Sequence, residues 1–235
     1  MKNSDHQLFF SSDVTESTAL LDENETQHAV SVLRINKGDS LQITNGHGLI
    51  LECEFEGVCG KKACCVIKEK RIVPRTKPEV TLLLGLPDKD HFETVLEHAT
   101  ALGVARVVPL IMDHCRKPWW TGWEKSSQRF TYKMIVSMKQ CLYPYYPLLD
   151  SPTELSTILG GLPPLLVAHQ DGITFDDSLL ENRTHIASLI GPPGGFSEDE
   201  AKMLQSKGAR FVKIAHNRLR TELAATVMTS RLVSS

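Results

Sequence analysis

The sequence predicts an α/β protein, in which a mostly parallel sheet with helices on both faces follows a small β-barrel. Three observations lead to this fold class. Residues 1–73 have the pattern of short strands and turns. After Pro78, apolar runs of strand length alternate with helical patterns. Between these parts, residues 61–77 hold seven basic residues against one acidic residue and contain Pro74, which predicts a linker. We therefore expect domains at 1–73 and 74–235.

The composition excludes several classes of protein. The 235 residues are 41% hydrophobic and 23% charged with a net charge of -2, which excludes a mostly disordered chain and disfavours a globally cationic nucleic-acid binder. A local basic face remains compatible with it. No stretch approaches the roughly 20 apolar residues that span a bilayer, and the polar start Met1–His6 has no leader pattern. We expect a cytoplasmic protein with reduced cysteines and no metal site.

The N-terminal elements follow from alternation and turn signals. Leu41–Thr44 predicts a strand, Asn45–Gly48 a hairpin turn, and Leu49–Phe55 the returning strand. Cys64–Ile67 predicts another strand, and a helical period over residues 29–34 predicts a helix before them.

The second part begins with an apolar run, Val80–Leu84, which is typical of a strand buried on both faces. Asp88 is a plausible N-cap for a helix that Gly103 ends. Further strands are expected at Val107–Met112, Leu165–Ala168, Ala187–Ile190 and Phe211–Ile214, and further helices at Trp123–Gln140, from Ser197 onward, and at about 221–233.

A Gly/Pro-rich loop, Gly191–Phe196, is the most informative segment. It follows a buried strand, and Ser197 with Glu200 forms a capping box that starts a helix. Ligands bind at the carboxyl ends of strands in open α/β sheets, so we favour a ligand loop over a plain turn. The loop matches neither G-x-G-x-x-G nor the P-loop pattern, which removes the main support for a nicotinamide or P-loop nucleotide site.

A second motif, Arg218–Thr226, follows the last expected strand. Thr221 is a good N-cap, and Glu222 suits the first turn of a helix. Capping does not explain the two arginines before the helix. Arg220, close to the Gly/Pro loop, is suited to hold an anionic or electron-rich group.

The two motifs together, I-G-P-x-G-G-F-S at 190–197 and R-L-R-T-E-x-A at 218–224, resemble the RsmE family. These SPOUT-superfamily enzymes methylate N3 of a uridine in 16S ribosomal RNA with S-adenosylmethionine. The resemblance extends over nearly the whole chain. It includes Val32–Arg34 with Gly38-Asp39 and Asn45-Gly46 in the barrel, Ala101–Val104, Val108–Leu110, and Met138–Cys141.

The resemblance implies a SPOUT-type α/β-knot (deep trefoil) domain behind a PUA-like barrel, and a homodimer that acts on 16S rRNA of the small ribosomal subunit. It implies that three loops of the knot bind S-adenosylmethionine. On this chain the implied cofactor residues are Ala168, His169, Ile190, Gly191, Pro192, Pro193, Gly194, Gly195, Phe196, Ile214, Leu219, Arg220, Thr221 and Ala224.

Four positions depart from the family pattern. Pro193 stands where the family usually has Glu, and Ala215 stands where it has Gly. His98 replaces a common Lys, and Ala101 replaces the Glu of Glu-Leu-Gly. Any contact that the missing glutamate at position 193 makes is lost or replaced.

Methylation at uridine N3 requires an unpaired or flipped base, because N3–H lies on the Watson–Crick edge. The displacement at the sulfonium methyl depends mostly on positioning. Negative charge develops on the uracil carbonyl oxygens, so Arg220 is the expected catalytic residue. Glu222 is the weaker candidate, either as the base or as an anchor for Arg220, and the proton acceptor stays unassigned.

RNA affinity is expected from phosphate contacts of Arg34, Lys37, Arg116 and Lys117. The tryptophans at 119, 120 and 123 and the tyrosines at 143, 145 and 146 fit base stacking and core or dimer packing equally well. Two other functions stay open: a SPOUT methyltransferase acting on another base or on a ribose 2′-hydroxyl, and a non-catalytic RNA-binding protein of the same fold.

Overall fold

The computed structural model describes residues 7–116 and 118–233, and the chain divides into two compact units. The first unit contains residues up to Arg75 together with Ile135–Tyr146, and the second contains Thr76–Met134 and the chain from Pro147 onward. Two expectations fall outside the described residues: the polar start at 1–6, and Lys117 as an RNA contact. Within the described ranges, no helix combines the length and apolar character that crossing a membrane requires.

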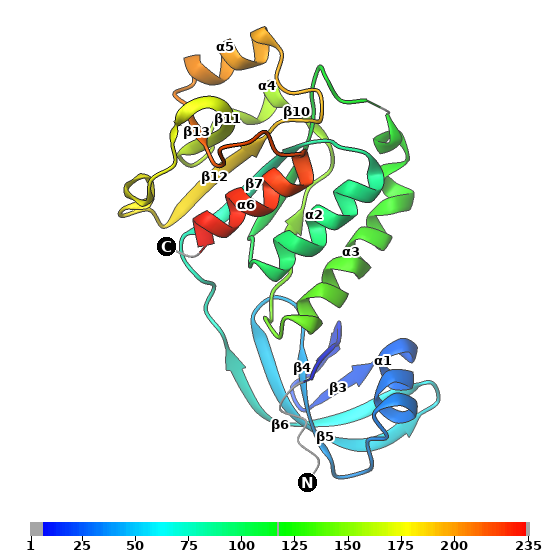
Figure 1. The fold of residues 1–235 in the computed structure, drawn as a ribbon. Coiled ribbons are helices and arrows are strands. Elements are labelled where there is room, and N and C mark those ends of the chain that lie inside the picture. The colour runs from blue at the N-terminus through cyan, green and yellow to red at the C-terminus, as the bar shows by residue number, and fades with distance from the viewer. Residues whose placement is uncertain (1–6, 117, 234–235) are drawn as a thin grey trace. The chain divides into compact units, whose positions relative to one another are not determined.

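The first unit is a curled six-stranded sheet in the order β1-β4-β5-β6-β3-β2 (Figure 1). All pairings are antiparallel except the parallel pair β1–β4. Alternate strand residues such as Leu21, Leu41 and Leu51 point into one apolar core. The strands are β1 (Leu8–Phe10), β2 (Asp13–Val14), β3 (Thr18–Leu21), β4 (Ser40–Thr44), β5 (Leu49–Cys59) and β6 (Lys62–Ile72).

Two features of the first unit differ from expectation. Residues 62–72 form strand β6, so the predicted linker is wrong over most of its length. Its lysines are partly paired, since Lys62 lies 3.0 Å from Asp13 and Lys68 lies 3.1 Å from Glu54. The expected helix at 29–34 is instead a short helix, α1 (Glu23–Gln27), followed by a π-helical turn, η1 (His28–Val32).

The segment Ile135–Tyr146 also belongs to the first unit, which the expected division into 1–73 and 74–235 did not include. The Tyr145 hydroxyl donates to the Val73 carbonyl at 2.7 Å, and the Arg75 guanidinium lies 4.1 Å from the centre of the Tyr145 ring. Lys139 forms an ion pair with the buried carboxylate of Glu25. These contacts give Tyr145 a packing role.

The second unit contains a seven-stranded sheet whose pairings are all parallel, in the order β10-β8-β7-β12-β11-β13 with β9 beside β8. The predicted parallel sheet is therefore confirmed. Its strands are β7 (Glu79–Gly85), β8 (Arg106–Ile111), β9 (Leu148–Leu149), β10 (Thr153–Glu154), β11 (Leu165–Thr174), β12 (His185–Ile190) and β13 (Arg210–Lys213).

Helices cover both faces of this sheet (Figure 1). On one face, α2 (Lys89–Ala101) and α6 (Thr221–Val233) contact each other. On the other, Leu155 of α4 (Leu155–Ile158) and Leu204 of α5 (Glu198–Ser206) join one apolar cluster with Leu83 of β7. The other helices are η2 (Trp119–Gly122), α3 (Trp123–Gln140) and η3 (Asp177–Leu180).

Strand β11 is longer than expected and irregular. Its pairing with β13 jumps between Ala168 and Ile173, both of which face Val212, so the residues between them form a bulge. Ala168, an implied cofactor residue, is the last paired residue before this bulge, and His169, another, lies within it. A second correction concerns Thr221, which is the first residue of α6 rather than its N-cap.

Candidate active site

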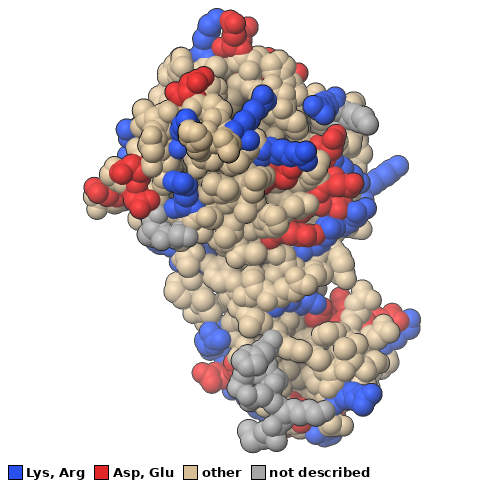
Figure 2. All heavy atoms as spheres, in the orientation of Figure 1, with Lys and Arg blue, Asp and Glu red and all other residues tan. Residues whose placement is uncertain are grey.

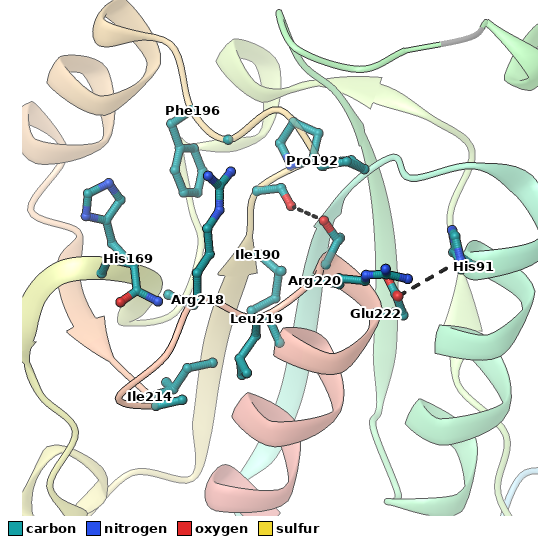
Figure 3. A pocket seen from close by; sticks show the side chains of 18 of the residues that line it. His91, His169, Ile190, Pro192, Phe196, Ile214, Arg218, Leu219, Arg220 and Glu222 are labelled. Atoms are coloured by element: carbon teal, nitrogen blue, oxygen red, sulfur yellow. Dashed lines mark hydrogen bonds and ion pairs between the residues drawn. The ribbon is translucent and has the colours of Figure 1, made fainter.

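A pocket of about 760 Å³ lies where β12 and β13 end and β11 bulges (Figure 3). Cofactor pockets typically have volumes of roughly 300–1,000 Å³. Both sequence motifs line it, as expected for the carboxyl edge of a parallel sheet. The expected residues on its wall are Ala168, His169, Ile190, Gly191, Pro192, Pro193, Gly195, Phe196, Ile214, Leu219, Arg220, Thr221, Glu222, Ala224 and Arg116.

The Gly/Pro loop is held against the loop that follows β8. The Gly195 amide donates to the Pro192 carbonyl at 2.8 Å, and His114 Nδ1 lies 3.1 Å from the Gly195 carbonyl oxygen. Gly194 packs behind the wall, because a Cβ at this position would lie 2.6 Å from Cβ of His114. The expected capping box is present, with Ser197 and Glu200 each bonded to the other's backbone amide.

The two motifs are joined by a hydrogen bond. The hydroxyl of Thr221 donates to the carbonyl oxygen of Gly191 at 3.2 Å, and Thr221 is buried. This side chain therefore holds the start of α6 to the end of β12 instead of capping its own helix.

The pocket has two ends (Figure 3). At one end lie Phe196, Arg218 and His169, whose ring centre is 6.2 Å from that of Phe196. At the other end lie Arg220 and Glu222, whose carboxylate is 4.0 Å from Nε2 of His91. The apolar residues Ile190 and Leu219 lie between the ends (Figure 3).

The family resemblance implies cofactor loops at 168–170, 191–196 and 214–221, and these contain the lining residues Gln170, Ala215 and Arg218. Three other lining residues, His91, Asp88 and Asp171, were not assigned to the site from the sequence. His91 gave no signal, because it is one polar residue of a helical pattern and meets Glu222 only through the contact of α2 with α6.

The wall chemistry fits S-adenosylmethionine. Apolar side chains between the ends suit an adenosine group, while imidazole, carboxylate and guanidinium groups suit its polar parts. Gly195 has a φ of +80°, and a Cβ there would meet no heavy atom within 4 Å, so its backbone borders open space.

Two of the four departures from the family pattern, Pro193 and Ala215, also line the pocket.

The other two departures lie on α2. His98 does not line the pocket, and its Nδ1 lies 2.9 Å from the hydroxyl of Thr226 on α6. This contact gives His98 a role in holding the two helices together. Arg34 and Lys37 belong to the first unit, where Lys37 forms an ion pair with Glu56 at 2.9 Å.

The tryptophans have different environments. Trp119 and Trp123 pack around Phe92 with ring centres 5.4 and 5.7 Å away, and the Trp119 indole donates to the Pro87 carbonyl at 2.8 Å. Trp120 lines a separate hollow with Lys125. Core packing is therefore the role of Trp119 and Trp123.

Charges on the visible face are mixed. Lys and Arg side chains are mixed with Asp and Glu side chains in the space-filling view (Figure 2).

No group of three His, Cys, Asp or Glu residues with metal-binding geometry occurs in 7–116 or 118–233.

Comparison with known proteins decides the family. The RNA methyltransferase domain family matches residues 74–233, and the RNA methyltransferase PUA domain matches residues 21–69. The chain belongs to the RsmE family of RNA methyltransferases. The expected fold class, a SPOUT-type α/β domain preceded by a PUA-like barrel, is confirmed.

Individual members of the family align over almost their full length. Ribosomal RNA small subunit methyltransferase E of Aquifex aeolicus is 26% identical, covering 97% of this chain and 99% of that protein. A methyltransferase structure from Legionella pneumophila with bound SAM has a TM-score of 0.85 at 25% identity, covering 97% and 96% of the two chains. The RsmE structure from Neisseria gonorrhoeae, also bound to S-adenosyl methionine, has a TM-score of 0.82 at 19% identity and covers 95% of each chain.

Proposed function

We propose that this protein transfers the methyl group of S-adenosylmethionine to N3 of a uridine in 16S rRNA of the small ribosomal subunit. The observation that carries the proposal is the position of Arg220 and Glu222 at one end of a cofactor-sized pocket built from both family motifs. The names of the relatives, and the cofactor bound in two related structures, support the same substrates.

The position of each lining residue suggests whether it contacts the cofactor or the uracil. Ile190, Ile214 and Leu219 would hold the adenosine part of the cofactor, and the glycine loop would border it closely. Arg220 would orient the uracil and stabilise the negative charge that develops on its carbonyl oxygens. N3 gives up its proton, its electron pair bonds to the methyl carbon, the carbon–sulfur bond breaks, and that bond's electron pair stays on sulfur. The products are 3-methyluridine, S-adenosylhomocysteine and a proton.

We assign RNA contact to both predicted domains, 1–73 and 74–235. Arg34 and Lys37 in the first, and Arg116 and Lys117 in the second, are proposed phosphate ligands. Arg116 lines the pocket itself, which makes it the best supported of the four.

We further propose that the protein is a cytoplasmic homodimer. The dimer is what the family resemblance implies, and Leu223, which follows Glu222 directly and is 50% exposed, is a candidate contact for the partner subunit. Light scattering of the purified protein tests this proposal, and a monomeric mass would contradict it.

The function is tested on small ribosomal subunits from cells that lack the gene. Incubation with the protein and methyl-labelled S-adenosylmethionine should yield 3-methyluridine, identified by mass spectrometry of the digested rRNA. Another methylated base or a 2′-O-methylribose would assign a different SPOUT activity. An absence of both product and calorimetric cofactor binding would indicate a non-catalytic RNA-binding protein.

A further inference from the structure

Two histidines of α2, seven residues apart, lie on the helix face that meets α6, and the structure separates their roles. His98 is engaged by the Thr226 hydroxyl, with its Nδ1 2.9 Å from that oxygen. His91 lines the pocket instead, and its Nε2 is 4.0 Å from the Glu222 carboxylate. That distance is within ion-pair range but too long for a hydrogen bond, so the carboxylate does not occupy this nitrogen.

The surroundings of His91 combine opposite charges from three elements. Glu222 faces it from α6, Arg220 stands just before α6, and Asp88 stands just before its own helix. Arg116, from the loop after β8, is on the same wall. The His91 side chain is 46% exposed and that of Glu222 is 20% exposed. The imidazole can therefore exchange a proton with solvent, while the carboxylate is held at the end of the pocket.

We propose that His91 is the proton acceptor for uridine N3–H, an inference that rests on the proposed function. Its neutral imidazole takes the N3 proton as the N3–carbon bond forms and the carbon–sulfur bond breaks. The resulting imidazolium then loses the proton to water. Atoms and charge balance, because the sulfonium becomes a neutral thioether while one proton is released to water.

The neighbouring groups suit this role. Glu222 stabilises the imidazolium after the proton has moved, as a carboxylate does beside a catalytic histidine. Arg220 attracts the uracil oxygens. Histidine is the side chain that most often serves as a general acid or base in enzymes.

The test compares wild type, His91→Gln and His185→Gln in single-turnover methylation of small subunits across a pH series. His185 is a matched control, because it is a half-exposed histidine that faces Glu79, outside the pocket wall. We expect His91→Gln to lose about 100-fold or more in rate, with a residual rate that rises with pH as N3 ionises unaided. His185→Gln should behave like wild type. Calorimetric affinity for S-adenosylmethionine should stay within about twofold for all three, which separates a catalytic defect from a folding defect.

A second variant tests the role of Glu222, the carboxylate that faces His91. Glu222→Gln removes the carboxylate that stabilises the imidazolium, so the single-turnover rate should fall, but by less than in His91→Gln. A wild-type rate and profile in His91→Gln would overturn the proposal while leaving the methyltransferase function intact. A larger loss in Glu222→Gln than in His91→Gln would make Glu222 the acceptor and would also overturn it. Absence of 3-methyluridine with wild-type protein would overturn both inferences.

Discussion

Thr221 donates a hydrogen bond to the carbonyl of Gly191 at 3.2 Å, and this bond links two motifs that are 30 residues apart in sequence. It fixes the start of α6 against the end of β12, the edge from which Arg220 and Glu222 reach the pocket. The geometry of the site therefore depends on a side chain that the sequence predicted as a helix cap and, through the family resemblance, as a cofactor residue.

Replacing Thr221 by Val removes this donor without a large change in volume. We expect a loss of about 1–2 kcal/mol in stability, because the partly buried Gly191 carbonyl loses a hydrogen-bond partner, and several-fold weaker binding of S-adenosylmethionine. Thr221→Ser retains the hydroxyl and serves as the control in denaturant unfolding and calorimetry. Equal behaviour of the Val variant and wild type would show that the bond does not shape the pocket.

Replacing Arg220 by Ala should lower the rate of methyl transfer by about 100-fold or more, because the carbonyl oxygens lose the donor to their developing charge. Arg220→Lys should recover only part of this, since lysine keeps the charge but lacks the planar fork of donors. Single-turnover rates on small subunits measure both variants. Near-normal turnover of Arg220→Ala would remove this residue from the mechanism.

Replacing Gly194 by Ala should displace the glycine loop, because the new Cβ would lie 2.6 Å from Cβ of His114 and 3.1 Å from its carbonyl oxygen. Overpacking of this kind costs about 1–3 kcal/mol. Gly160→Ala is the matched control, since a Cβ there meets no atom within 4 Å. Thermal unfolding and cofactor titration report the difference, and similar results for the two variants would contradict the packing argument.

Truncating the three tryptophans should give unequal effects on stability. Trp119→Ala and Trp123→Ala should each cost about 3 kcal/mol, because both rings pack around Phe92. Trp120→Ala should cost clearly less, since this ring lines an open hollow. Denaturant unfolding measures all three, and a Trp120 loss as large as that of Trp119 would place it in the core.

The barrel should lose stability at alkaline pH. Burial raises the pKa of the Cys53 thiol from its ordinary 9.0 to about 12, with a smaller contribution from Glu52, and burial likewise raises that of Cys65 to about 12. The unfolded chain releases these protons first, so the stabilisation is complete below pH 9 and is lost between 9 and about 12. Denaturant unfolding over this range should show a falling free energy, and replacing both cysteines by Ala should flatten the slope. An unchanged slope would exclude these thiols as the cause.

Much of the fold could be read from the sequence because its signals are local. The apolar run at 80–84 is strand β7, and the helical period from 123 to 140 is α3. Most residues of the two family motifs line the pocket, although Gly194 does not. The expected strand at Cys64–Ile67 is part of β6, but charge and nearby prolines predicted a linker over 61–77, whereas pairing with β5 extends the strand to residues 62–72. Strand pairing depends on a partner distant in sequence, which local composition does not reveal.

Local patterns in the sequence are enough to predict the order of most strands and helices, the family motifs, and the loops at the carboxyl edge of the parallel sheet. Which side chains share the pocket depends on tertiary packing. His91 lies opposite Glu222 because α2 and α6 pack together, and Thr221 reaches Gly191 because β12 and α6 adjoin. Periodicity specifies which face of a helix is buried, but the partner across that face is set by the packing of the whole domain.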